Sequence, residues 1–310
     1  MDEFARIALL KRIFQRENPA VALGIGDDAA ILRPSATPLA TSVDVAVDDV
    51  HFRRSWLTLE ALGRRALMAA ASDIAAMGGT FVGALSSLIL PAGFGDAELE
   101  SLAEGIHAGA TELDGSVFGG NLAQGAELSI TTTVFGQLTA RRDRTGAAPG
   151  DGVYVTGTIG GAGAGCACLL AERPELGPAA VERWRAPRAQ IELGREIADA
   201  ASAMLDISDG LLQDLGHLCT ASEVGATIEY AAVPIDPAAE EAAAGLSTDL
   251  PTLVLSGGED YELVFSAPAN VGAALPATRI GTIRQTPGVE VLDDQGAPIV
   301  VPQKGHRHFR

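Results

Sequence analysis

The feature that most constrains the fold is a turn-rich segment near the middle of the chain, Ala147-Ala148-Pro149-Gly150-Asp151-Gly152. Pro and Gly end helices and strands, so this composition predicts a boundary between two folded halves. The chain has 310 residues, which is long enough for two ordinary domains. We therefore expect one domain over residues 1–148 and a second over residues 149–310.

Apolar periodicity predicts that both halves combine helices with strands. In the first half we expect helices over 2–16, 58–77 and 97–113, the last two capped by Thr58 and Asp96, and strands over 39–44, 81–90, 116–118 and 127–138. In the second half we expect helices near 161–173, 188–201, 209–222 and 236–246, and strands near 153–156, 203–206, 226–230, 261–265 and 277–283. This order favours a two-domain fold of the α+β or α/β class.

The chain is acidic, with 22 Lys and Arg against 40 Asp and Glu and a net charge of −18. This balance excludes the basic surface that binds nucleic acid or an anionic membrane. No apolar run reaches the ~18 residues that span a membrane, and the acidic N-terminus precedes no signal-peptide core, so we expect a cytoplasmic protein. Three cysteines without a CxxC pair exclude zinc-ribbon and disulfide-rich classes. A phosphate ligand would need a divalent cation to offset the repulsion, and Mg²⁺ prefers oxygen ligands.

The acidic loop Gly24-Ile25-Gly26-Asp27-Asp28-Ala29 superficially matches a dinucleotide-binding fingerprint. That motif needs a long helix directly after it, but here Pro34 follows too soon and two carboxylates would repel a pyrophosphate. A structural turn is a second interpretation, and we favour a loop that holds metal and phosphate. The sequence has no GxxxxGK[ST] segment and no set of protein-kinase motifs, which excludes those two classes of enzyme.

Three further acids lie where a carboxylate needs an explanation. Asp73 has apolar neighbours three and four residues away on the helix predicted over 58–77, so its carboxylate is expected on the buried face. That position is costly unless the carboxylate binds metal or, as the alternative, bonds to the backbone or a distant arginine. Asp206 and Asp209 lie between a predicted strand and a predicted helix. Helix capping explains Asp209 alone, whereas a metal–phosphate platform explains both.

Four other segments stand out, each with a simpler alternative. The turn over 257–263 brings Glu259 and a second acid into a strand, or is a solvated turn. Gly119-Gly120-Asn121 is predicted as a similar strand-end turn. The arginines of the segment 141–144 face a polyphosphate or form a solvated linker. His51 is a lone histidine, and lone histidines are more often structural.

Together these segments resemble the thiamine-monophosphate kinase family, in the superfamily of aminoimidazole ribonucleotide synthetase. The eight matching motifs, in the order of that family, are GIGDDAA, the strand ending in Asp44, VHF at 50–52, SDIAAMGG at 72–79, GGN at 119–121, RTG at 144–146, DISDG at 206–210 and SGGEDYEL at 256–263. They extend over nearly the whole chain, which makes the resemblance far more specific than any one motif.

The resemblance implies a PurM-like fold, in which the N-terminal sheet domain forms a barrel across a homodimer and the C-terminal domain is of the α/β class. It implies ATP-dependent phosphorylation of thiamine monophosphate to thiamine diphosphate by direct in-line transfer, assisted by several Mg²⁺ ions. By resemblance, the metal ligands are Asp28, Ser42, Val43 through its backbone, Asp44, Asp73, Asn121, Asp206 and Asp209. The nucleotide contacts are Gly120, Asn121, Arg144 and Ser208, and the substrate contacts are His51, Glu259 and His306.

This chain departs from the family pattern at two positions. Asn121 stands where the family has Asp, which removes one negative charge from a metal ligand. His306 stands where the family has an aromatic residue suited to stacking, and imidazole offers a smaller surface. Asn121 keeps open the alternative of a non-catalytic relative that binds nucleotide and metal. Another ATP-using enzyme of the superfamily, such as aminoimidazole ribonucleotide synthetase, is a further alternative.

Overall fold

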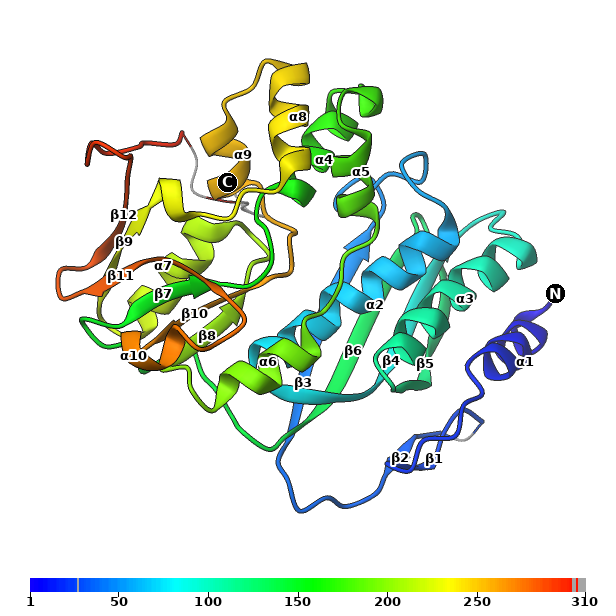
Figure 1. Cartoon of the computed structure of the whole chain (residues 1–310). Helices are drawn as coiled ribbons and strands as arrows, with labels where there is room; N and C mark the ends of the chain where they lie inside the picture. Colours follow the sequence, from blue (N-terminus) through cyan, green and yellow to red (C-terminus); the bar gives the residue numbers. More distant parts are fainter. Residues whose placement is uncertain (27, 303–304, 306–310) are drawn as a thin grey trace. The chain divides into compact units, whose positions relative to one another are not determined.

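The computed structural model describes residues 1–26, 28–302 and 305, and its chain divides into two compact units (Figure 1). Unit 1 contains Met1–Ile74 and Gly79–Thr139, and unit 2 contains Ala75–Gly78 and Ala140–Arg310. Residues 140–148, which precede the predicted boundary at 148/149, belong to unit 2. Within it, the Asp143 carbonyl accepts a hydrogen bond of 3.0 Å from the Met204 amide.

Unit 1 is built on a four-stranded sheet with the order β3-β6-β4-β5. Its strands are β3 (Leu39–Val47), β4 (Gly79–Pro91), β5 (Ser116–Gly125) and β6 (Ser129–Leu138). β4 and β5 are parallel, and the other two pairs are antiparallel. Helices α2 (Leu59–Ala76) and α3 (Asp96–Glu112) cover one face (Figure 1).

The covered face of this sheet is apolar and buried. Ile130, Thr132 and Val134 alternate along β6 and are at most 1% exposed. A side chain at Gly136, the next residue in this alternation, would contact Ile74 of α2. Alternate residues of a strand point to the same side of the sheet, so the even-numbered residues of β6 face the helices.

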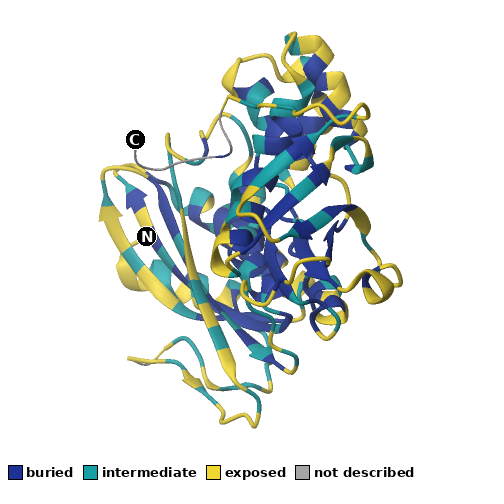
Figure 2. Ribbon diagram, turned by 90° about the vertical axis from the view of Figure 1, so that its left-hand side faces the viewer, coloured by how far each residue is buried: buried dark blue, intermediate teal, exposed yellow. Residues whose placement is uncertain are grey.

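The opposite face of the sheet is open. Leu39, Val43 and Val45 alternate along β3 and are exposed although they are large and apolar, and Ile89 of β4 is exposed as well. Figure 2 shows such exposed residues along strands whose other residues are buried. An exposed apolar patch of this kind is typical of a surface that a partner covers.

The N-terminal part of unit 1 consists of a helix and a hairpin. α1 (Glu3–Ile13) begins at the N-cap Asp2, whose carboxylate accepts a hydrogen bond of 2.8 Å from the Ala5 amide. β1 (Val21–Leu23) and β2 (Ile31–Leu32) form an antiparallel hairpin, and the acidic loop connects them. A strand therefore follows the loop where a dinucleotide fingerprint requires a helix, which rules out that interpretation.

Unit 2 contains a six-stranded sheet with the order β12-β9-β11-β7-β10-β8. The strands are β7 (Gly152–Val155), β8 (Ala203–Asp206), β9 (Gly225–Glu229), β10 (Leu263–Ala267), β11 (Thr278–Arg284) and β12 (Gly288–Leu292). All neighbouring pairs are antiparallel except β12 with β9. Residues Leu211, Leu215 and Leu218 of one helix are buried in the same hydrophobic core as this sheet.

That helix is α7 (Leu211–Ala221), which packs next to β8, β9 and β12. The other helices of unit 2 are α4 (Gly161–Leu170), α5 (Pro178–Arg185), α6 (Ile191–Ala198), α8 (Pro237–Leu246), α9 (Leu250–Ser256) and α10 (Ala269–Gly272), with 3₁₀ turns η1 (Pro174–Leu176) and η2 (Tyr230–Ala232). The helix predicted over 236–246 is confirmed as α8, with its N-cap at Asp236.

Three local predictions are wrong. The N-cap of α3 is Gly95, whose amide donates to the Glu98 carboxylate at 2.6 Å, whereas Asp96 accepts a hydrogen bond from Arg6. Asp44 lies inside β3 rather than at its end, because pairing with β6 continues to Val47. Gly119-Gly120-Asn121 lies inside β5 rather than in a turn, because each residue pairs with β4.

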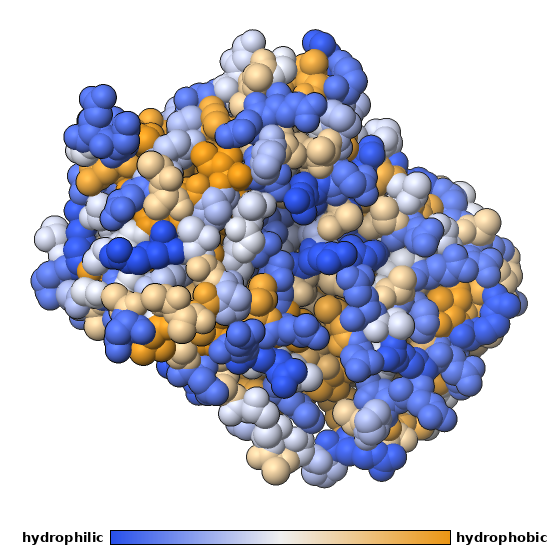
Figure 3. Space-filling model, in the orientation of Figure 1, coloured by the Kyte–Doolittle hydropathy of each residue, from blue (hydrophilic) through white to orange (hydrophobic). Residues whose placement is uncertain are grey.

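Among the described residues, no helix is both long and apolar enough to cross a membrane. Figure 3 shows hydrophilic and hydrophobic residues interspersed over the face in view.

Candidate functional site

Asp73 of α2 is held by a residue from a different strand. The Ser42 hydroxyl on β3 donates a hydrogen bond of 2.5 Å to Oδ2 of Asp73. Both residues are half-buried. The partner of the carboxylate is therefore a neutral hydroxyl, so the pair keeps its full negative charge, as a cation site requires.

Asp44 extends this group along β3. It lies two residues beyond Ser42 on the same strand, so both side chains point to the side of the sheet on which α2 lies. Its carboxylate is exposed, and Oδ1 accepts a hydrogen bond of 2.7 Å from the Val45 amide. Val43 lies between them, with its side chain on the open face and 61% exposed. Ser42, Asp44 and Asp73 thus bring three oxygen-bearing side chains to one region.

Gly120 lies in the same row of the sheet as Asp44. Asp44 pairs with Thr132, Thr132 with Ser86, and Ser86 with Gly120. A Cβ at position 120 would lie 1.9 Å from the Ser86 carbonyl oxygen, so this close approach of β4 and β5 requires glycine. Asn121 is in the next row, paired with Ser87, and is exposed. The strand register therefore places Asn121 in a different row of the sheet from Asp44.

The acidic loop comes close to β5. A side chain at Gly119 would contact Ala30, which follows Asp28 by two residues. Asp28 is exposed. On the other side of the loop, a Cβ at Gly26 would lie 2.5 Å from Nζ of Lys11, which puts one of the two lysines of the chain beside the acidic segment. The structure thus brings the Asp28 loop next to Gly119-Gly120.

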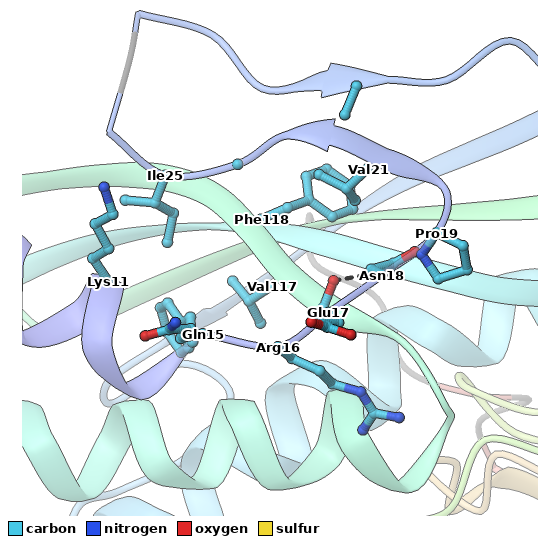
Figure 4. Close-up of a pocket in the computed structure, with 14 residues that line it drawn as sticks. Lys11, Gln15, Arg16, Glu17, Asn18, Pro19, Val21, Ile25, Val117 and Phe118 are labelled. Carbon is cyan, nitrogen blue, oxygen red and sulfur yellow. Dashed lines mark hydrogen bonds between the residues drawn. The ribbon is translucent and has the colours of Figure 1, made fainter.

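A cavity of about 600 Å³ lies beneath this loop (Figure 4). Its lining includes Lys11, Phe14, Asn18 and Phe118, and the amide of Asn18 donates a hydrogen bond of 2.9 Å to the Ser116 hydroxyl. None of the predicted metal ligands lines it. The cavity therefore adjoins the acidic loop without being the place where the acids meet.

His51 lies in the turn after β3 and is half-buried. Its Nδ1 accepts a hydrogen bond of 3.1 Å from the Val47 amide, so the neutral ring carries its proton on Nε2. This contact fixes the orientation of the imidazole ring.

In unit 2, Asp206 and Asp209 come from the short loop between β8 and α7. Asp206 is 5% exposed at the end of β8, and Asp209 is half-buried. Oδ2 of Asp209 accepts a hydrogen bond of 2.7 Å from the Gln213 side chain. The N-cap of α7 is Gly210, so Asp209 does not cap the helix, and the capping interpretation is wrong.

A further acid, in the first turn of α7, contacts this loop. Asp214 is 3% exposed, and its Oδ2 accepts hydrogen bonds of 3.0 Å from the amides of Ser208, Asp209 and Gly210. Burial, followed by the charges of Asp206 and Asp209, raises the pKa of Asp214 to about 7. The ligand atoms of Asp209, Asp214 and His217 lie within 4.8 Å of one another. In the sequence, Asp214 is an ordinary acid in the first turn of a helix, and nothing distinguishes it.

The turn over 257–262 runs beside this loop. The Glu259 amide donates to the Ser208 carbonyl at 2.8 Å, and the Tyr261 amide donates to the Ile207 carbonyl at 2.9 Å. Glu259 and Tyr261 have φ angles of 61° and 52°, in the left-handed region that non-glycine residues rarely adopt. Backbone strain of this kind persists where the surroundings fix it, and it is concentrated at functional sites.

The three acids of this turn each hold a different element. Oε2 of Glu259 accepts a hydrogen bond of 2.6 Å from the indole of Trp184, which is fully buried. Asp260 accepts from the amides of Gly160 and Ala162 at the start of α4, and desolvation raises its pKa to about 7. Burial also raises the pKa of Glu262. Glu262 accepts hydrogen bonds from the side chains of Thr156 and Gln190, so Glu259 and Glu262 contact side chains, whereas Asp260 is held by main-chain amides.

The arginine segment is largely engaged within the protein. Arg141 forms two hydrogen bonds of 2.7 Å with Asp143, and Arg142 donates to the Ala198 carbonyl at 2.8 Å. Arg144 has an exposed side chain. Its segment lies beside the start of β8, roughly 7 Å along the strand from Asp206. Of the three arginines, Arg144 is therefore the one suited to an outside phosphate.

The predicted substrate contact His306 lies outside the described residues. Its neighbour Gly305 is described and buried, and a side chain at position 305 would contact Gln213 and the Asp209 carbonyl.

Known proteins are similar to this chain over nearly its whole length. Residues 26–138 of this chain match the family model of the AIR synthase related protein, N-terminal domain. Residues 148–294 match the model of the AIR synthase related protein, C-terminal domain. The thiamine-monophosphate kinase of Escherichia coli (strain K12) is 35% identical, with 97% of each chain covered. That of Aquifex aeolicus (strain VF5) is 32% identical over 100% of this chain and 98% of the relative.

The chain belongs to the thiamine-monophosphate kinase family.

The solved structure of AaThiL complexed with AMPPCP and TMP superposes with a TM-score of 0.82 at 32% identity, covering 99% of this chain and 97% of the other. Escherichia coli HypE, a hydrogenase maturation protein, has a TM-score of 0.79 at 21% identity, which shows a common fold alone. These comparisons confirm the family and the two-domain, PurM-like fold class predicted from the sequence. They also confirm a phosphotransferase of the thiamine-monophosphate kinase type.

Proposed function

We propose that this chain transfers the γ-phosphoryl group of ATP to thiamine monophosphate, giving thiamine diphosphate and ADP. A phosphate oxygen of thiamine monophosphate attacks the γ-phosphorus in line, and the bond to the β-phosphate oxygen of ATP breaks. The observation that carries this proposal is the full-length similarity to AaThiL, which was solved with AMPPCP and TMP. No covalent intermediate is needed, because phosphoryl transfer depends on positioning and on stabilisation of charge.

The test is ADP release by the purified protein with ATP and MgCl₂, with and without thiamine monophosphate. We expect release that depends on the acceptor, and thiamine diphosphate as the product. ATP binding without release would support the non-catalytic alternative. Release with the substrate of aminoimidazole ribonucleotide synthetase instead would support the other alternative.

We propose that Mg²⁺ ions bind at two groups of acidic residues, one in unit 1 and one in unit 2. The donor set is made of carboxylates, a hydroxyl, the Asn121 amide oxygen and the main chain of Val43, and oxygen donors suit a hard cation. In unit 2, burial and then the charges of Asp206 and Asp209 raise the pKa of Asp214, and a cation would offset those charges. The proposed ligands are Asp28, Ser42, Val43 through its backbone, Asp44, Asp73, Asn121, Asp206 and Asp209. When bound, the ions neutralise the phosphate charges and orient the two reactants.

The chain's own residues bind and orient the reactants. We assign nucleotide contacts to Gly120, Asn121, Arg144 and Ser208, and substrate contacts to His51, Glu259 and His306. Arg144 supplies a charge that needs no protonation change. His51 and Glu259 are each fixed by a hydrogen bond to another part of their own unit, so both are preorganised for binding.

Asn121 supports a direct prediction about metal affinity. If its amide oxygen binds Mg²⁺, Asn121→Asp adds a full charge and is expected to lower the Mg²⁺ concentration at half-maximal activity about tenfold or more. Its side chain is exposed, so the change is expected to leave the melting temperature unchanged. The measurement is a Mg²⁺ titration of thiamine monophosphate phosphorylation by both proteins. Equal midpoints would remove Asn121 from the ligand set, and activity in the variant alone would identify the natural chain as non-catalytic.

We further propose a homodimer in which the open face of the unit 1 sheet is covered by that of a second copy, closing a barrel. Leu39, Val43, Val45 and Ile89 supply the apolar surface for it. Sedimentation velocity is expected to give twice the mass of the 31.8 kDa chain, and Val43→Asp is expected to shift it toward the monomer. A monomeric natural chain at micromolar concentration would contradict the barrel. The cytoplasmic location stays a prediction.

A further inference from the structure

The loop between β8 and α7 is held from both sides by main-chain hydrogen bonds. On one side, a single carboxylate oxygen of Asp214 accepts the amides of Ser208, Asp209 and Gly210, each at 3.0 Å. On the other side, the Ser208 carbonyl accepts the Glu259 amide at 2.8 Å. The conformation of residues 208–210 is therefore determined by contacts of the main chain, and the Asp209 side chain has a partner of its own, Gln213, at its Oδ2.

This arrangement changes what the start of α7 can do. The free amides at a helix N-terminus commonly bind a phosphate. Here the three amides of residues 208–210 are directed at Asp214 instead, and the 3% exposure of that residue keeps other anions away. Recognition of a phosphate at this loop is therefore left to side chains and to cations that those side chains hold.

Oδ2 of Asp214 is poorly suited to serve as a metal ligand. The oxygen that accepts three amides lies among three N–H dipoles whose positive ends point at it. A cation at the same oxygen would be repelled by those dipoles. Asp209, in contrast, receives a hydrogen bond from the Gln213 side chain on its Oδ2 and lies at half-buried depth.

We propose that Asp214 is a positioning residue for phosphoryl transfer: it fixes the loop so that Asp209 is presented to a metal ion and Ser208 to the nucleotide. The inference rests on the proposed function of this site. Groups that orient metal ligands commonly change metal affinity or activity 10- to 100-fold when they are replaced. The role does not require Asp214 to touch either reactant.

Two substitutions separate positioning from simple stabilisation of the helix. Asp214→Asn keeps one acceptor oxygen and nearly the same size, whereas Asp214→Leu removes every acceptor. Amide hydrogen exchange of residues 208–210 is expected to rise in both, and more in Asp214→Leu. The Mg²⁺ concentration at half-maximal ADP release is expected to rise about tenfold in Asp214→Leu and about threefold in Asp214→Asn, with part of kcat recovered at saturating Mg²⁺.

Asp236→Asn is the matched control. Asp236 is also 3% exposed in unit 2, and it accepts a hydrogen bond of 2.9 Å from the Ala238 amide at the start of α8. This variant is expected to lose thermal stability while its Mg²⁺ midpoint stays that of the natural chain. A midpoint that shifts equally in Asp236→Asn and Asp214→Asn would reduce the effect to general destabilisation and overturn the proposal.

The test of the role of Asp214 does not depend on turnover alone. Mg²⁺ and AMPPCP binding, measured by calorimetry, test Asp214 even if the natural chain releases no ADP, a result that would contradict the proposed function instead. If Asp214→Leu does not fold, Asp214→Asn still decides the matter. Faster exchange of the three amides together with unchanged Mg²⁺ binding would overturn the inference, as would amide exchange that stays at the natural rate.

Discussion

Asp73→Asn and Asp206→Asn are each expected to lower kcat by about 100-fold or more, which is about 3 kcal/mol of activation free energy. Asp73 is bonded to a neutral hydroxyl, and Asp206 ends a buried strand beside two other acids. The hydroxyl that contacts Asp73 carries no charge, so it does not offset the charge of that carboxylate. The amide keeps the size and one oxygen but removes the charge that a cation needs.

The fold is expected to survive both changes, because asparagine has nearly the size of aspartate and keeps one of its two oxygens. Circular dichroism and the melting temperature provide that check. Asp114→Asn and Asp151→Asn are the matched controls in units 1 and 2: the first pairs with Arg16 at the surface, and the second accepts the Ala148 amide. Natural kinetics in both the Asp73 and Asp206 variants would remove these residues from the site.

Removal of divalent metal is expected to abolish turnover and to weaken ATP binding by about 100-fold or more. The chain carries a net charge of −18, and the acids that we assign to the site would repel a bare triphosphate. Equilibrium binding of AMPPCP in excess chelator, at constant ionic strength, measures the loss. Restoring Mg²⁺ is expected to restore both binding and activity.

The control for this experiment is an added monovalent salt at matched ionic strength, which screens charge without bridging ligands. If sodium chloride restored AMPPCP binding in chelator, general screening would account for the effect. Undiminished affinity in chelator would show that protein groups alone hold the phosphates, and the proposed ligand set would fail.

Short-range patterns predicted much of the framework. Helical spacing predicted that Asp73 lies on the buried face of its helix, and the structure has it half-buried. Thr58 was confirmed at the start of α2, where its hydroxyl accepts the Ala61 amide at 3.2 Å. The partner of Asp73 was not predictable, because Ser42 lies on a strand 31 residues earlier and strand pairing decides which side it faces. Helical periodicity predicts which face of a helix is buried, but tertiary contacts determine which residues pack against that face.

Long-range contacts explain the remaining differences. The turn over 257–262 looked like a flexible segment, but its acids bind elements about 70 to 100 residues away, such as Trp184 and the start of α4. The hydrogen bonds of Asp214 depend on the path of a loop four to six residues before it, which apolar spacing does not encode. The family resemblance located the motifs, but it could not show which acids are structural.

Neighbouring positions on β5 differ in how freely evolution can change them. Position 120 admits no side chain, since even a methyl group would meet the Ser86 carbonyl, so the path of the strand is fixed there. Position 121 is exposed, and its side chain can be exchanged without disturbing the sheet. Under the proposed ligand set, a single substitution at position 121 would change the charge beside the metal without altering the path of the strand. The demand for Mg²⁺ would then be adjustable separately from the stability of the sheet.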